Sequence, residues 1–141
     1  MSTTAYQIIA VDFDGTLCYS NWPELGEPNR PLIEYLINQK RSGNKLILWT
    51  CRAGEALEKA VSWCKDHDLT FDAVNDNLPE IIEMYGNNSR KITCDYYIDD
   101  KAVLPQLLNM MLAEVCINTM ISEYYGAAEP PVRCGDPRNN Q

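Results

Sequence analysis

The chain has 141 residues, 45% of them hydrophobic, and a formal net charge of -8. This length predicts one domain that is large enough to bury a core. The negative charge disfavours binding to phosphate backbones, so nucleic acid is not an expected partner. Residues 1–5 lack the pattern of a signal peptide and no apolar run reaches membrane-spanning length, so we expect a cytoplasmic protein with no membrane partner.

The sequence contains six cysteines without a Cys-x-x-Cys pair and one histidine. Cysteines spread in this way, without a secretory signal, predict reduced thiols rather than a disulfide framework. One histidine is too few for a typical zinc cluster that uses histidines, and no histidine-based triad is expected.

The first expected element is a buried strand over residues 6–11, an apolar and β-rich run that ends in two carboxylates. Side chains at i and i+2 of an extended segment share a face, so Asp12 and Asp14 should project together from the end of this strand. Two like charges this close repel each other unless a cation or a proton lies between them. A divalent metal is the expected partner.

The next segment, residues 18–28, is rich in turn-forming residues and predicts a loop or a small hairpin beside the carboxylates. An amphipathic helix should follow, capped by Asn29 and ended by Gly43. A continuous apolar strand over residues 45–52 comes next, and Thr50 lies near its end. A second strand end that carries polar groups is therefore expected.

Three further elements repeat the alternation of helix and strand. A helix is expected over residues 54–66, a short strand over residues 71–74, and a short helix around residues 81–85. Residues 95–101 then resemble the opening run, because an apolar strand ends in two acids, Asp99 and Asp100. These elements predict an α/β fold, a single doubly wound parallel sheet flanked by helices.

The carboxyl ends of parallel strands share one edge of a sheet, where ligand sites usually lie. We therefore expect the polar groups at the strand ends to converge there: Asp12, Asp14, Thr50, Asp99 and Asp100. One domain is expected over residues 1–126, followed by a loose tail over residues 127–141.

The string Asp-Phe-Asp-Gly-Thr-Leu at residues 12–17, followed in order by Thr50, Lys91 and the pair Asp99–Asp100, resembles the motifs of the haloacid dehalogenase (HAD) phosphatase superfamily. The resemblance extends from residue 6 to residue 101 and leaves no room for a cap domain. It implies a Rossmann-like, HAD-type fold and a Mg²⁺-dependent phosphatase that acts on a small phosphorylated substrate.

By this resemblance, Asp12 is the nucleophile that forms an aspartyl phosphate, and Asp14 is the general acid. Thr50 is expected to hydrogen-bond the phosphoryl group. Lys91 is expected to neutralise it, with the adjacent Arg90 as the alternative cation. These expectations assign each catalytic task to one side chain.

The same resemblance implies ligands for Mg²⁺ and for the substrate. The metal set is Asp12, Asp14 through its main-chain carbonyl, Asp99 and Asp100, and Asp100 is favoured over Asp99 as the direct ligand. The expected substrate-binding set is Gly15, Thr16, Cys51 and Arg52. Arg52 either contacts the substrate or forms a salt bridge at a helix start, and Trp22 either touches the substrate or pins its loop to the body.

Two alternatives to a phosphatase share parts of this pattern. A two-component receiver domain also forms an aspartyl phosphate at the edge of a parallel sheet, but it has no acid pair after its lysine. A non-catalytic module of the same fold that binds phosphate or Mg²⁺ is the second alternative. The order of the motifs favours the phosphatase, and the leaving group stays open.

A long helix is expected over residues 104–125, and it carries more apolar residues than one core-facing stripe needs. Met110, Leu112 and Ile117 fall outside the stripe. Either neighbouring elements of the same chain or a second copy must cover them. We expect a homodimer, in which a partner subunit also shelters the open site.

Overall fold

A computed structural model describes residues 5–125. It divides the chain into two compact units, Met1–Ala102 and Val103–Gln141. The expected domain over residues 1–126 stays a prediction, and the tail expected from residue 127 lies outside the described residues.

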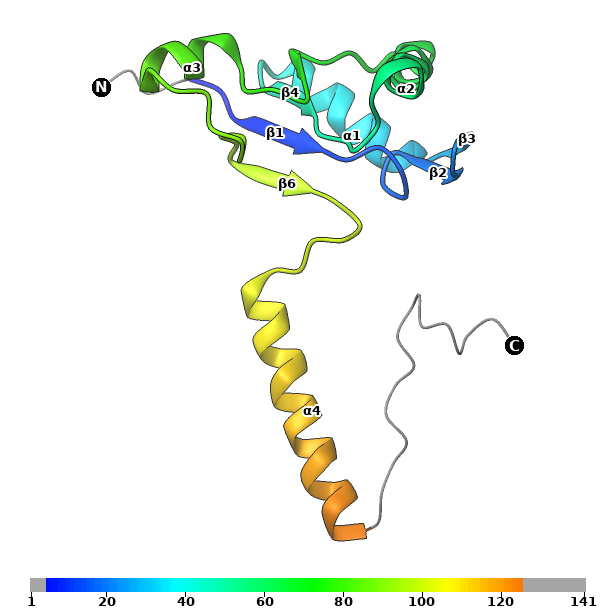
Figure 1. The fold of residues 1–141 in the computed structure, drawn as a ribbon, viewed down its shortest axis with the longest axis vertical. Helices are drawn as coiled ribbons and strands as arrows, with labels where there is room; N and C mark the ends of the chain where they lie inside the picture. The colour runs from blue at the N-terminus through cyan, green and yellow to red at the C-terminus, as the bar shows by residue number, and fades with distance from the viewer. Residues whose placement is uncertain (1–4, 126–141) are drawn as a thin grey trace. The chain divides into compact units, whose positions relative to one another are not determined.

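The first unit contains a parallel sheet with the strand order β5-β4-β1-β6. Its strands are β1 (Ile8–Val11), β4 (Lys45–Leu48), β5 (Ala73–Val74) and β6 (Tyr96–Ile98). Figure 1 shows β1 between β4 and β6. Ile9 pairs with Leu46 on one side and with Tyr96 on the other, and all pairings in this sheet are parallel. The predicted α/β class with a parallel sheet is confirmed.

Helices cover both faces of this sheet, because β1 buries all of its side chains and β4 buries all of its side chains except that of Lys45. The helices are α1 (Arg30–Arg41), α2 (Gly54–Asp66) and α3 (Pro79–Tyr85). Alternate residues of β1 belong to two separate core clusters, since neighbouring side chains of a strand point to opposite faces. One cluster joins the sheet to α1 and α2 through Ile9, Val11, Ile33, Leu36, Leu46, Leu48, Ala60 and Cys64. The other joins it to α3 through Ile8, Ala10, Ile47, Leu78 and Ile81.

Helix α1 begins where the sequence predicts it, because Asn29 caps it. The Asn29 Oδ1 accepts a hydrogen bond from the N–H of Leu32 at 3.4 Å, and Pro31 lies in the first turn. The Asn29 Nδ2 also donates to the carbonyl oxygen of Thr16 at 3.0 Å. The cap therefore ties the start of α1 to the loop that follows β1.

The segment after that loop is the predicted small hairpin. Strands β2 (Cys18–Asn21) and β3 (Glu24–Pro28) pair antiparallel, with Cys18 opposite Pro28. Trp22 and Pro23 form the turn between them. The hairpin therefore carries an aromatic side chain at its tip.

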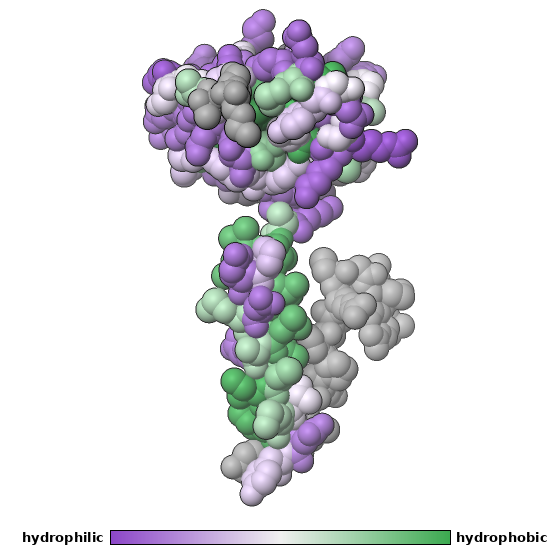
Figure 2. Space-filling model, turned by 90° about the vertical axis from the view of Figure 1, so that its left-hand side faces the viewer, coloured by the Kyte–Doolittle hydropathy of each residue, from purple (hydrophilic) through white to green (hydrophobic). Residues whose placement is uncertain are grey.

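The second unit contains the predicted long helix, α4 (Pro105–Tyr125). Taken by itself, this helix carries apolar side chains around its whole circumference, and Figure 2 shows many of them on one side. Their large side chains are exposed in the single chain, among them Leu107, Met110, Leu112, Val115 and Ile117. The homodimer stays a prediction.

Two further expectations concern the whole chain. Among residues 5–125, no helix is long and apolar enough to cross a membrane. The cysteines in the same part of the chain are free thiols, and Cys134 lies outside it.

Candidate functional site

The strand order places a topological switch point between β1 and β6. From β1 the chain runs to β4 and β5 on one side and then returns to β6 on the other. Ligands of open α/β sheets bind at such a point, outside the carboxyl ends of the strands. Asp12 follows β1, and its N–H donates to the carbonyl oxygen of Ile98 in β6 at 2.9 Å. The two strand ends that carry acids are therefore neighbours.

Three carboxylates meet at this point. One oxygen from each of Asp12, Asp99 and Asp100 lies within 4.8 Å of the others. Burial raises the pKa of Asp12 to about 6, and the charges of Asp99 and Asp100 act in the same direction. A purely oxygen-based, anionic donor set suits a hard divalent cation such as Mg²⁺. The residues present therefore fit the expected metal.

A cleft of about 390 Å³ opens over the cluster. Its lining residues are Asp12, Asp14, Trp22, Thr50, Cys51, Asp99, Asp100 and Lys101. Phe13 is fully buried between the two acids of the first motif, so that Asp12 and Asp14 both face the cleft. The structure thus brings together most of the catalytic and metal-binding residues predicted from the sequence.

The Thr16 hydroxyl links the first motif to the last. It donates to Oδ2 of Asp12 at 3.0 Å and accepts a hydrogen bond from the N–H of Asp100 at 3.1 Å. The residue is only 6% exposed and is not among the lining residues of the cleft. Its position indicates that it orients two of the clustered acids, whereas the predicted substrate contact stays a prediction.

Gly15 lies directly under the carboxylate of Asp100. Its φ of +77° is in the left-handed region that favours glycine, and a Cβ added to it would overlap Oδ2 of Asp100. The Gly15 N–H donates to the carbonyl oxygen of Cys18 at 2.9 Å, which closes the loop after β1. A glycine is therefore favoured by the backbone conformation, and a side chain at this position would displace the neighbouring carboxylate.

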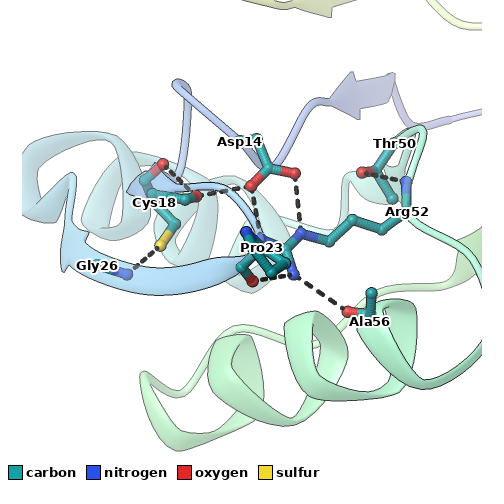
Figure 3. Close-up of polar contacts among 8 residues, drawn as sticks. Asp14, Cys18, Pro23, Gly26, Thr50, Arg52 and Ala56 are labelled. Carbon is teal, nitrogen blue, oxygen red and sulfur yellow. Dashed lines mark hydrogen bonds and ion pairs between the residues drawn. The ribbon is translucent and has the colours of Figure 1, made fainter.

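Asp14 is turned toward Arg52 (Figure 3) and is not one of the three clustered acids. The Nε and Nη2 atoms of Arg52 donate to its two carboxylate oxygens at 2.8 and 2.7 Å, and the Ser20 hydroxyl donates at 2.6 Å. Partial burial opposes ionisation, but these hydrogen bonds hold the pKa of Asp14 below its usual value. The side chain of Asp14 is therefore an ionised carboxylate in this arrangement.

Arg52 is buried, with 1% of its surface exposed. Its Nη1 donates to the carbonyl oxygens of Pro23 at 3.3 Å and Ala56 at 3.5 Å. Its guanidinium lies over the rings of two aromatic side chains, 5.0 Å from the centre of Phe13 and 4.7 Å from that of Trp22. Of the two predicted roles, the structure displays the salt bridge, and a substrate contact stays a prediction.

Asn75 holds the loop that carries Thr50. Its Oδ1 accepts a hydrogen bond from the N–H of Thr50 at 2.8 Å, and its Nδ2 donates to the carbonyl oxygen of Arg52 at 3.3 Å. Asn75 adopts a φ of +51°, a conformation that asparagine tolerates better than most residues. Asn75 was not among the site residues predicted from the sequence, although its place directly after a predicted strand was a signal for this role.

Lys101 lines the cleft, whereas neither of the two predicted cations does, and the phosphate contact expected of Lys91 or Arg90 stays a prediction. Lys91 is exposed and does not line the cleft, and Arg90 lines a separate hollow together with Trp49 and Asn75. Among the described lining residues, Lys101 carries the positive charge, and it also helps to lower the pKa of Asp14. Lys101 was not among the site residues predicted from the sequence, although its position next to Asp100 was a signal.

Comparisons with known proteins bear on the fold. No protein-family model and no curated protein matches the chain. A solved structure, that of a conserved protein from Bacteroides thetaiotaomicron, matches it with 38% sequence identity and a TM-score of 0.62. The match covers 78% of this chain and 92% of the Bacteroides chain. The two chains belong to one family. Membership of this family supports the α/β fold and leaves the activity to be argued from the site.

Proposed function

We propose that the protein is a Mg²⁺-dependent phosphomonoester hydrolase that acts through an aspartyl phosphate on Asp12. The observation that carries this proposal is the cluster of Asp12, Asp99 and Asp100 at the switch point of the sheet, in a cleft that also holds Thr50 and Lys101. The resemblance of residues 12–17 to the first HAD motif supports the choice of Asp12 as nucleophile.

The clustered carboxylates of Asp12, Asp99 and Asp100 would hold the metal, and the main-chain carbonyl of Asp14 stays a predicted further ligand. A bound Mg²⁺ supplies positive charge that offsets the phosphoryl oxygens. Lys101 adds a second positive charge from the cleft wall. The Thr50 hydroxyl accepts a hydrogen bond from the N–H of Arg52, so its own O–H can donate to a phosphoryl oxygen.

The hydrogen bond from Thr16 orients the Asp12 carboxylate for attack on phosphorus. The attack forms a bond between Asp12 and phosphorus, and the bond from phosphorus to the leaving oxygen breaks with its electron pair on that oxygen. Water then attacks the same phosphorus and gives a proton to the Asp14 carboxylate. The bond between phosphorus and Asp12 breaks, which releases phosphate and regenerates the Asp12 carboxylate. Splitting the reaction in this way requires only one nucleophilic side chain.

The leaving oxygen also needs a proton, and Asp14 is the acid that lines the cleft beside Asp12. Because Arg52 holds Asp14 in its ionised form, Asp14 acts as an acid only after this ion pair opens and the carboxyl takes up a proton. In the arrangement described here, Asp14 therefore carries no proton that it could donate to the leaving oxygen.

The same ion pair favours one alternative function. A module that binds phosphate and Mg²⁺ without hydrolysis needs no protonated Asp14, and a permanent pair with Arg52 would suit it. Both functions use the acidic cluster, so metal binding does not distinguish them. Measuring hydrolysis distinguishes them, because only the phosphatase turns over its substrate.

Hydrolysis of 4-nitrophenyl phosphate with Mg²⁺ and with EDTA tests the proposal. We expect activity with Mg²⁺, none in EDTA, and none for Asp12→Asn, whereas Asp14→Asn should lose about 10²- to 10⁴-fold. Asp66→Asn, an exposed acid at the end of α2, is the matched control and should keep full activity. An Asp12→Asn variant as active as wild type would overturn the nucleophile, and Mg²⁺-dependent phosphate binding without turnover would favour the binding module.

A further inference from the structure

The tip of the β2–β3 hairpin places an unusually exposed aromatic side chain on the wall of the cleft. Trp22 is 63% exposed and lines the cleft together with Thr50 and Cys51. Tryptophan is highly buried on average, because its ring gains much from leaving water. An exposed indole beside the reacting groups therefore needs an explanation other than packing of the hairpin.

The indole is held in place from one side by a fixed cation. The Cζ atom of Arg52 lies 4.7 Å from the centre of the Trp22 ring, and the same guanidinium lies 5.0 Å from the centre of the Phe13 ring. Two hydrogen bonds to Asp14 and one to the carbonyl oxygen of Pro23 fix the guanidinium itself. The ring is thus oriented before any ligand arrives, which lowers the entropic cost of binding against it.

The contact with Arg52 explains how the hairpin is pinned, but it leaves much of the indole surface open. A phosphate group alone gains little from that surface, because it is charged and strongly hydrated. A planar ring gains free energy by stacking on the indole, and this stacking needs no hydrogen bonds. The cleft, at about 390 Å³, also has room for a group beyond the phosphate.

We propose, on the basis of the proposed function, that Trp22 determines specificity by stacking on a planar ring in the leaving group. The preferred substrates are then phosphomonoesters of alcohols that carry an aryl or heterocyclic ring. Saturated leaving groups of equal size are poorer substrates, since they lack a flat face to place against the indole.

Two matched substrate pairs test this preference. Benzyl phosphate and cyclohexylmethyl phosphate share the same linkage to phosphorus and differ in the planarity of the ring. Adenosine 5′-monophosphate and ribose 5-phosphate share the sugar linkage and differ in the base, so this pair tests a ring placed farther from phosphorus. We expect wild type to prefer the planar member of at least one pair by about 5- to 100-fold in kcat/KM.

The variants separate stacking from a structural role. Trp22→Ala should remove the preference, whereas Trp22→Phe should keep most of it. Trp22→Leu retains apolar cover over Arg52 without a ring, so it should also lose the preference even if the alanine variant folds poorly. Tyr19→Ala is the matched control, because Tyr19 is an exposed aromatic residue of the same hairpin that does not line the cleft.

Binding of benzylphosphonate and cyclohexylmethylphosphonate, measured by calorimetry with Mg²⁺, provides a readout without turnover. Tighter binding of the benzyl compound by wild type and equal binding by Trp22→Leu support the inference. Equal handling of both members of every pair by wild type, or a preference that survives in Trp22→Leu, would overturn it. Ring-selective binding without hydrolysis would overturn the proposed function alone, and neither binding nor hydrolysis would overturn both.

Discussion

Arg52 donates two hydrogen bonds to the carboxylate of Asp14, with Nε 2.8 Å from Oδ2 and Nη2 2.7 Å from Oδ1. The planar guanidinium matches the two oxygens of the carboxylate, a geometry that a lysine ammonium cannot reproduce. The same guanidinium also holds the hairpin through the carbonyl oxygen of Pro23 and the ring of Trp22. One side chain thus connects the acid of the first motif to the wall of the cleft.

Replacing Arg52 by lysine should therefore destabilise the protein without removing the charge. We expect Arg52→Lys to lower the free energy of unfolding by about 1–3 kcal/mol, since a largely buried, charge-assisted pair loses one of its two hydrogen bonds. Urea unfolding measures this loss. Arg41→Lys, a change at an exposed arginine at the end of α1, is the control and should stay within about 0.5 kcal/mol of wild type. Equal losses in both variants would contradict the role of the pair.

A methyl group on Gly15 should disturb the acidic cluster more than the fold. In Gly15→Ala the left-handed φ costs about 1–2 kcal/mol. The new Cβ also overlaps the Asp100 carboxylate, which can rotate away because it ends a flexible side chain. We expect a folded variant whose Mg²⁺ affinity, measured by calorimetry, falls about 10- to 100-fold.

Gly86→Ala separates the two effects of that substitution. Gly86 also has a left-handed φ, of +63°, but no atom lies within 4 Å of the position of its added Cβ. This variant should show a similar loss of stability and unchanged Mg²⁺ affinity. If both variants bind Mg²⁺ like wild type, Asp100 is not placed by Gly15 in the way described.

The hydroxyl group of Thr16 should contribute more to the stability of the protein than its methyl group does. Thr16→Val keeps the volume but removes the donor to Asp12 and the acceptor for the N–H of Asp100. We expect a loss of about 1–3 kcal/mol in the free energy of unfolding, because polar groups near the buried Thr16 lose their partner. Thr16→Ser retains the hydroxyl and should recover most of this stability. A serine variant no more stable than the valine variant would show that the methyl group, and not the hydroxyl, is what matters.

Without metal, the Asp12 carboxylate should weaken the fold. Its pKa is raised from 3.8 to about 6 in the folded protein, so the folded state binds more protons than the unfolded state. Its contribution to stability is therefore lost as the pH rises from about 4 to 6, and at pH 7 the full penalty is present. In EDTA at pH 7, Asp12→Asn should raise the free energy of unfolding by about 1–3 kcal/mol.

Millimolar Mg²⁺ should reduce or reverse this difference in stability between Asp12→Asn and wild type. A cation that binds only the folded state stabilises wild type by mass action, whereas Asp12→Asn lacks one of its charged ligands. Thermal melts of both proteins in EDTA and in Mg²⁺ provide the measurement. Asp66→Asn should respond to Mg²⁺ like wild type. If Mg²⁺ raised the melting temperature of Asp12→Asn as much as that of wild type, Asp12 would not be a ligand of the metal.

Much of the fold could be predicted from the sequence because its signals are local. The apolar run before Asp12 and the one before Asp99 indicate strands by themselves, and Asn29 marks the start of a helix by its capping chemistry. Strands β4 and β5 are shorter than predicted. Apolar patterning does not record where a ladder of hydrogen bonds stops, so residues beyond Leu48 continue the pattern without continuing the strand.

The clustering of Asp12, Asp99 and Asp100 also followed from the sequence, since carboxyl ends of parallel strands must share one edge of a sheet. That edge alone does not decide which way each side chain turns. Asp12 and Asp14 both face the cleft, yet only Asp12 belongs to the cluster, whereas Asp14 forms an ion pair with Arg52.

The sequence by itself determined the element order, the parallel sheet and the acids at its edge. The reason is that the hydrophobic periodicity of an element, and the polar residues that follow a strand, can be recognised from consecutive residues. Only the tertiary structure decided the partners of those acids. Arg52 reaches Asp14 from 38 residues away, and the N–H of Asp100 reaches Thr16 from 84 residues away. Such contacts depend on how the loops at the ends of different strands pack together, and no local pattern carries that information.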